Sequence, residues 1–195
     1  GLGGNVDVLT CRADWLFHRG AYEACHALCG RVLEADPYAL QALPLALSSA
    51  LVLGRRSELF MRGHKLVAEY PGHAVAWYAV GLYYMASKQY EAARRYLSKA
   101  TSLDPGFAPA WVAFGHAFSA QDERDQAMAA YRTAARLFPG LHLPVLGMGM
   151  EYSAMNNLQL AERMLLAAHE LCPGDAVTCH ELGVCAYKGG NVAQA

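Results

Sequence analysis

The sequence has 195 residues, of which 54% are apolar and 17% are charged, so the chain is long enough to bury a sizeable core. Sixteen basic and 17 acidic side chains leave a formal net charge of -1, and no stretch concentrates Lys and Arg. Phosphate backbones and anionic membrane surfaces attract clustered positive charge, so we expect neither nucleic acid nor a membrane as a partner.

The most apolar run, at 42–54, contains Pro44 and is much shorter than the roughly 20 residues that a membrane-spanning helix needs. The six cysteines include no CxxC pair, which argues against a zinc knuckle. Because a free cysteine behaves as a small hydrophobe, we expect buried thiols in a reducing compartment, which means the nucleus or the cytoplasm.

After a leader at 1–5, a proline recurs at a constant interval, which equals the period of about 34 residues that is typical of the tetratricopeptide repeat, a pair of antiparallel helices. The recurring residues are Pro37, Pro71, Pro105, Pro139 and Pro173. They predict five repeats at 6–39, 40–73, 74–107, 108–141 and 142–175, followed by a truncated sixth repeat at 176–195. Because the sixth repeat is incomplete, we expect the parent protein to continue.

The first two repeats match the pattern loosely, since Leu47 and Gly63 replace the usual small and bulky positions of the second. Apolar residues such as Leu59, Leu66 and Val67 still recur at helical spacing before the proline. We therefore predict helical hairpins in both.

The third, fourth and fifth repeats match the pattern closely. A small residue in each helix lets two antiparallel helices approach closely. This close packing offsets the cost of each Gly, which is about 1 kcal/mol less favourable than Ala in a helix. Aromatic residues fill the space beside them, and the proline cannot continue the second helix. These structural positions are Trp77, Gly81, Tyr84, Ala93 and Pro105, then Trp111, Gly115, Ala127 and Pro139, and finally Gly149, Ala161 and Pro173.

One repeat cannot bury its own apolar face, so we predict an all-α, right-handed superhelical solenoid of antiparallel helix pairs. The first helix of each repeat would line a concave groove, with its second, fifth, ninth and twelfth residues on one stripe. The predicted groove residues are Tyr78, Leu82, Met85, Val112, His116, Ser119, Leu146, Met150, Ser153, His180, Val184 and Tyr187. Alternatively, part of this stripe packs against the opposite wall of a tight superhelix.

The predicted groove carries no Lys or Arg. Co-chaperone tetratricopeptide domains grip peptide carboxylates with such residues, because paired charges need charged donors. The lining instead favours an apolar or helical segment, with Met as an adaptable surface and Tyr, His and Ser as polar anchors.

The sequence shows no nucleophile with a base in reach and no phosphate-binding motif, so we expect no enzymatic activity and no cofactor. The strongest metal alternative combines His169, Cys172, Cys179, His180 and Cys185. Cys179 and Cys185 lie on one predicted helix at a separation that places them on different faces, so we expect no zinc.

Residues inside the repeats resemble one particular family. The runs ARRYLSKA at 93–100, PAWVAFGH at 109–116 and DQAMAAY at 125–131 resemble the subunit 6 family of the anaphase-promoting complex. The resemblance implies a non-catalytic scaffold of a multisubunit ubiquitin ligase that drives mitotic cell-cycle progression, with the ubiquitin chemistry on other subunits. It also implies binding to the other subunits, including a small accessory subunit held in the groove, and a homodimer formed through repeats outside this segment.

Two other functions remain open. One is a generic adaptor or a co-chaperone-type module that reads short peptide ends, although the groove lacks the basic clamp. The other is an enzyme with its catalytic domain outside the given sequence.

Overall fold

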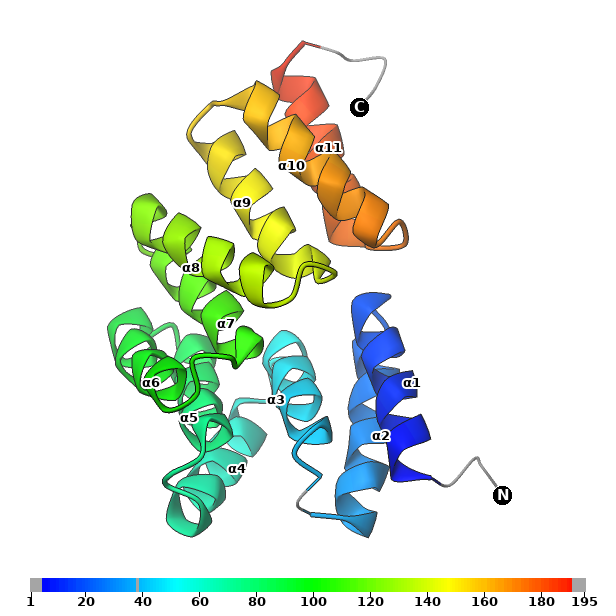
Figure 1. Cartoon of the computed structure of the whole chain (residues 1–195), viewed down its shortest axis with the longest axis vertical. Coiled ribbons are helices and arrows are strands. Elements are labelled where there is room, and N and C mark those ends of the chain that lie inside the picture. The colour runs from blue at the N-terminus through cyan, green and yellow to red at the C-terminus, as the bar shows by residue number, and fades with distance from the viewer. Residues whose placement is uncertain (1–4, 38, 191–195) are drawn as a thin grey trace. The chain divides into compact units, whose positions relative to one another are not determined.

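The computed structural model describes residues 5–37 and 39–190, and within them eleven helices pack in consecutive pairs without any strand (Figure 1). This arrangement confirms the all-helical tetratricopeptide fold. Most of the predicted leader at 1–5 and the end of the predicted sixth repeat, at 191–195, lie outside the described residues. In the described part of the chain, no helix is long and apolar enough to cross a membrane.

The helices fall into two compact units, Gly1–Phe107 and Ala108–Ala195. Unit 1 contains α1 (Val6–His18), α2 (Tyr22–Ala35), α3 (Ala42–Val52), α4 (Arg56–Glu69), α5 (Ala74–Ala86) and α6 (Tyr90–Leu103). Unit 2 contains α7 (Ala108–Ser119), α8 (Arg124–Leu137), α9 (His142–Ala154), α10 (Leu158–Leu171) and α11 (Ala176–Lys188). We call the odd-numbered helices first helices and the even-numbered ones second helices.

Small residues set the distance between the helices of a pair. A Cβ atom on Gly81 of α5 would lie 2.7 Å from the Leu97 side chain of α6, and one on Gly149 of α9 would lie 2.8 Å from Leu165 of α10. Real Cβ atoms do not approach other atoms this closely, so any larger residue there would force the leucine side chain of the partner helix to shift. The bulky partner residues recur once per repeat, as Leu97, Tyr131 and Leu165.

The loosely matching second repeat uses a glycine in another way. A Cβ on Gly63 of α4 would lie 3.4 Å from the backbone nitrogen of Val80. A methyl group would therefore make ordinary contact there, and only a longer side chain at Gly63 would push α4 away from the backbone of α5.

The turn after each first helix places one residue in the left-handed region. This residue recurs once per repeat, with φ between 57° and 80°. The six residues are Gly20, Gly54, Lys88, Asp122, Asn156 and Gly190. Left-handed backbone at this place ends a helix and returns the chain for the next one.

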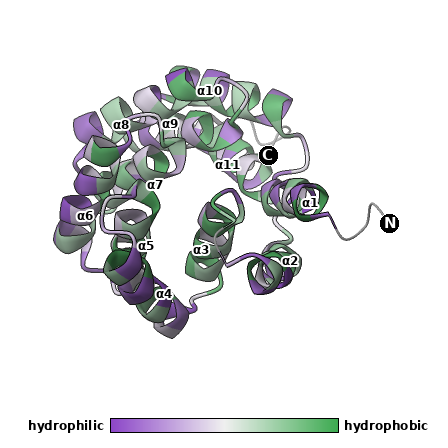
Figure 2. Ribbon diagram, turned by 60° about the horizontal axis from the view of Figure 1, so that its bottom comes forward, coloured by the Kyte–Doolittle hydropathy of each residue, from purple (hydrophilic) through white to green (hydrophobic). Residues whose placement is uncertain are grey.

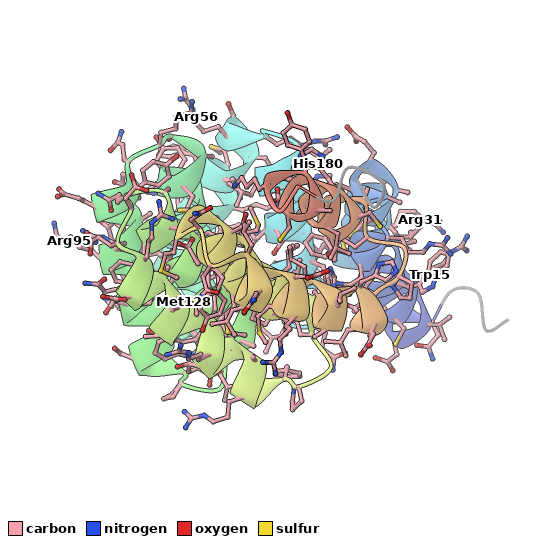
Figure 3. The ribbon with its side chains drawn as sticks, turned by 90° about the horizontal axis from the view of Figure 1, so that it is seen from above. Trp15, Arg31, Arg56, Arg95, Met128 and His180 are labelled. Atoms are coloured by element: carbon pink, nitrogen blue, oxygen red, sulfur yellow. The ribbon has the colours of Figure 1, made fainter. Side chains whose placement is uncertain are left out.

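The second helices of unit 1 present polar faces to solvent. In Figure 2, α4 and α6 carry purple, hydrophilic stretches. Arg31 on α2, Arg56 on α4 and Arg95 on α6 are exposed and extend away from the ribbon (Figure 3). Buried apolar residues such as Val32, Leu59 and Leu97 form the inward face of these helices, although Phe60 and Met61 of α4 are exposed.

Candidate protein-binding site

Two predicted groove residues of unit 1 are buried. Tyr78 on α5 is 3% exposed, and its hydroxyl lies 2.8 Å from that of Ser48 while its ring meets Phe107 edge-on. Burial raises the pKa of Tyr78 to about 12, against a smaller lowering by the bond to Ser48. Leu82 is also buried, and Met85 is half-buried. Tyr78 and Leu82 therefore fill space inside unit 1.

The first helices of unit 2 leave more of the stripe in contact with solvent. Helix α9 packs beside both α7 and α11, which brings the exposed side chains onto neighbouring helices. His116 on α7, Met150 on α9, and His180 and Tyr187 on α11 are exposed. Ser119 and Val184 are half-buried, whereas Val112, Leu146 and Ser153 are buried. We refer to His116, Ser119, Met150, His180, Val184 and Tyr187 as the unit 2 stripe.

A buried carboxylate lies beneath this stripe. Glu151 on α9 is only 2% exposed. It accepts a hydrogen bond from the hydroxyl of Ser119, and Arg124 Nη1 donates to its Oε2 at 3.2 Å. Arg124 also contacts Asp122 at 2.7 Å. The buried charge is therefore paired and hydrogen-bonded, which burial of a carboxylate requires.

His116 is held by a buried tyrosine. Its Nδ1 lies 2.8 Å from the hydroxyl of Tyr131, which reaches it from α8. Burial and the charge of Glu151 raise the pKa of Tyr131, against a lowering by a hydrogen bond with Ser119. Protein around the His116 ring lowers its pKa to about 4. The imidazole is therefore mainly neutral at pH 7.

The tyrosine ring itself is wedged between two glycines. A Cβ on Gly115 would overlap the ring of Tyr131, and one on Gly147 would lie 2.7 Å from it. The ring thus occupies the space between α7 and α9, and its hydroxyl points to the histidine. This packing fixes the position of the pair.

Polar contacts also hold both ends of α11 in unit 2. Asp175, buried at the start of α11, accepts from the backbone nitrogen of Thr178 at 2.8 Å and from its hydroxyl at 2.5 Å. His142 Nε2 lies 3.9 Å from the same carboxylate. At the other end of α11, Lys188 Nζ donates to Ser153 at 3.2 Å. A lysine outside the predicted stripe therefore places positive charge beside it.

The expected absence of a zinc site concerns the cysteines and histidines of α10 and α11. One pair among them, Cys179 Sγ and His169 Nδ1, lies 3.8 Å apart. Over residues 5–37 and 39–190, no group of three or more His, Cys, Asp and Glu side chains lies within reach of one ion. The expectation of buried thiols is correct for Cys25, Cys29 and Cys185 but wrong for Cys11 and Cys179, which are exposed.

The aromatic structural positions of the third repeat line a cleft of about 220 Å³ in unit 1. Trp77, Tyr84 and Tyr96 stack in succession, with ring centroids 5.9 and 5.2 Å apart. The ammonium of Lys99 lies 3.4 Å from the centroid of Trp77. Aromatic residues predicted to fill space between helices thus also form an outer surface with a cation on it.

The sequence assigns no place in the predicted groove to three residues of unit 2: Glu151, Tyr131 and Lys188. Tyr131 has a signal in the sequence, because the equivalent positions of the adjoining repeats hold Leu97 and Leu165. A hydroxyl at a position that otherwise takes leucine indicates a polar partner. The burial of Glu151 depends on a pairing with Arg124, which spacing does not reveal.

Known proteins are similar to this chain both in the repeat pattern and in the overall sequence. Models of the tetratricopeptide repeat match residues 74–107 and 108–140. Anaphase-promoting complex subunit 6 of Arabidopsis thaliana is 46% identical over 95% of the chain and 34% of its own length. The human cell division cycle protein 16 homolog is 44% identical over 97% of the chain and 31% of its own length.

Solved structures give a consistent result. A crystal structure of the APC/C hetero-tetramer Cut9–Hcn1 matches with a TM-score of 0.96 and 41% identity over 100% of the chain and 37% of that chain. A tetratricopeptide protein of Thermus thermophilus, TTC0263, shares only the fold, with a TM-score of 0.73 and 22% identity over 94% of the chain and 100% of that chain. The chain spans about a third of the length of the first two relatives.

Proposed function

We propose that this chain, which belongs to the anaphase-promoting complex subunit 6 family, is a non-catalytic, protein-binding scaffold segment of that multisubunit ubiquitin ligase. In this role it supports mitotic cell-cycle progression, while other subunits carry the ubiquitin chemistry. The protein acts in the nucleus and the cytoplasm.

One observation carries the proposal: the similarity to the subunit 6 relatives extends far beyond the tetratricopeptide pattern. The repeat models match only 74–140, whereas the Arabidopsis relative matches 95% of the chain. The first two repeats, whose general pattern is weak, are therefore part of the similarity. A generic adaptor would share the fold, as the Thermus protein does, but not this level of identity.

The unit 2 stripe is the proposed binding surface for a small accessory subunit. Cut9 was crystallised with the APC/C subunit Hcn1, and it is the solved relative of this chain described above. The stripe offers Met150, Val184 and Tyr187 as apolar contacts and two imidazoles as polar ones. Such a surface suits an apolar or helical segment. The full-length protein would also bind other subunits of the complex and form a homodimer through repeats outside this segment.

A charge placed on the stripe tests this surface. Met150 is 39% exposed on α9, and Met155, directly after α9 and outside the stripe, is 42% exposed. Met150→Glu should weaken binding of recombinant Hcn1 at least tenfold in calorimetry, because a carboxylate would lose water against an apolar segment. Met155→Glu is the matched control and should bind as the unmodified chain does. Equal affinity of both variants for Hcn1 would show that the unit 2 stripe is not the binding surface.

The mitotic role has its own test. Cells depleted of the protein that contains this chain should accumulate before mitotic exit, and re-expression of that protein should release them. Normal division after complete depletion would contradict the proposed role.

A further inference from the structure

A continuous ladder of side-chain rings crosses α4, α5 and α6 in unit 1. Neighbouring rings have centroids between 5.2 and 6.2 Å apart, and all the rings line the cleft of about 220 Å³ described above, which we call the aromatic cleft. In order along the ladder, the rings belong to His64, Phe60, Tyr83, Tyr84, Tyr96 and Trp77. The first two are exposed and the others are half-buried, so solvent reaches the ladder from one end to the other.

The repeat architecture does not require all of these rings. Phe60, Tyr83 and Tyr96 are outside the structural positions that recur from repeat to repeat. One repeat later, the corresponding residues are Arg94, Ala117 and Ala130. Because that repeat also forms its helix pair, the packing of helices does not explain the rings. A contiguous apolar surface that is left in contact with solvent marks an interaction site.

Positive charge without a matching carboxylate lies at one end of the ladder. The ammonium of Lys99 lies 3.4 Å from the centroid of Trp77, and no described residue forms an ion pair with it. Arg95, one helical turn earlier on α6, is exposed and likewise has no ion-pair partner in the described part of the chain. None of the described residues that line the aromatic cleft is acidic. The surface therefore complements a negative charge.

The size and chemistry of the aromatic cleft favour part of an extended polypeptide. Pockets for small molecules usually hold roughly 300–1,000 Å³, so this cleft admits one or two side chains. Aromatic-lined grooves bind proline-rich segments, whose polyproline II conformation exists before binding. Proline also leaves no backbone N–H unpaired against the faces of the rings. Such rings can attract a cation as well, but Lys99 already occupies that place at Trp77 and would repel a second positive charge.

We propose that the aromatic cleft binds a proline-rich segment of another protein in the polyproline II conformation, and that Lys99 pairs with an acidic residue flanking the prolines. The three tyrosines of the ladder can donate hydrogen bonds to the carbonyl groups of this segment, because polyproline II has no internal hydrogen bonds. The aromatic cleft belongs to unit 1, so its occupant is additional to the polypeptide proposed for the unit 2 stripe.

Calorimetry with two synthetic peptides tests the charge of the occupant. Both probes are polyproline, one with glutamates and one with lysines at its ends. The glutamate peptide should bind the chain about tenfold more tightly, because opposite charges meet at Lys99. Lys99→Glu should reverse this preference. Arg31→Glu makes the same change of charge on α2, outside the cleft, and should leave the preference as it is (Figure 3).

Two adjoining residues of α4 test the ladder itself. Phe60 lines the cleft and is 50% exposed, whereas Met61 is 66% exposed and outside the lining. Phe60→Ala should weaken binding of the glutamate peptide about tenfold, because the buried contact with a proline ring is lost. Met61→Ala should bind as the unmodified chain does. Both side chains are largely solvated, so the helical circular dichroism of both variants should be unchanged.

Each part of the proposal has an outcome that overturns it. Failure of the glutamate peptide to bind, or equal affinities of Phe60→Ala and Met61→Ala, would show that the aromatic cleft does not hold a proline-rich segment. Tighter binding of the lysine peptide, or an unchanged preference in Lys99→Glu, would show that the occupant is not acidic. None of these measurements uses Hcn1, so they can fail while the proposed function stands.

Discussion

The same substitution should have opposite effects at two glycines of unit 1. Gly54 has φ 69°, and Gly30 lies inside α2 with ordinary helical geometry. A Cβ at either position would meet no atom within 4 Å, so neither Gly→Ala change creates a clash with another residue. Left-handed backbone costs an L-residue about 1–2 kcal/mol, whereas Ala in a helix interior is favoured over Gly by about 1 kcal/mol.

Gly54→Ala should therefore destabilise the chain by about 1 kcal/mol, and Gly30→Ala should stabilise it by a similar amount. For a chain of this size, thermal unfolding followed by circular dichroism should show midpoint shifts of about 2–4 °C in opposite directions. Each variant serves as the control for the other, because the atoms added are identical. Shifts of the same sign would refute the assignment of the left-handed turn.

The remaining predictions concern the interior of unit 2. Glu151→Gln should lower the free energy of unfolding by about 2 kcal/mol, because Arg124 loses its buried ionic partner. Urea unfolding measures this change, and an unchanged midpoint would show that the pairing is absent. Gly115→Ala should cost about 1–3 kcal/mol by forcing a methyl group against Tyr131, whereas in a Tyr131→Ala background the same change should cost little, because the side chain that the methyl group meets has been removed. Additive losses in that double variant would contradict the proposed contact.

The all-helical fold could be predicted from the sequence because its causes are local and periodic. The small residues that recur once per repeat, such as Gly81 and Gly149, face the bulky residues Leu97 and Leu165 at distances that admit no Cβ. Any chain with this pattern must bring two helices close together there. The periodicity of the small and bulky residues therefore predicts which helices pair.

The left-handed turns could have been found in the same way. Gly20, Gly54 and Gly190 occupy the same position of their repeats, and Asp122 and Asn156 tolerate this conformation better than most residues. Lys88 hides the pattern, because lysine gives no signal of positive φ.

The solvent exposure of the predicted groove could not be read from the spacing. Tyr78 and His116 lie on corresponding helices, yet Tyr78 is buried against Ser48 and Phe107 and His116 is exposed. Which side chains a neighbouring helix covers depends on the sizes of its own residues. Helical periodicity assigns a face to a residue and leaves its coverage undetermined.

If the chain is a scaffold segment of the anaphase-promoting complex, the full-length protein that contains it must assemble with the other subunits. The most direct test is to tag the full-length protein that contains it, purify it from dividing cells and identify the bound proteins by quantitative mass spectrometry. Other subunits of the complex, including a small one, should be recovered in near-stoichiometric amounts. Recovery of the intact protein without those subunits, or with unrelated partners alone, would contradict it.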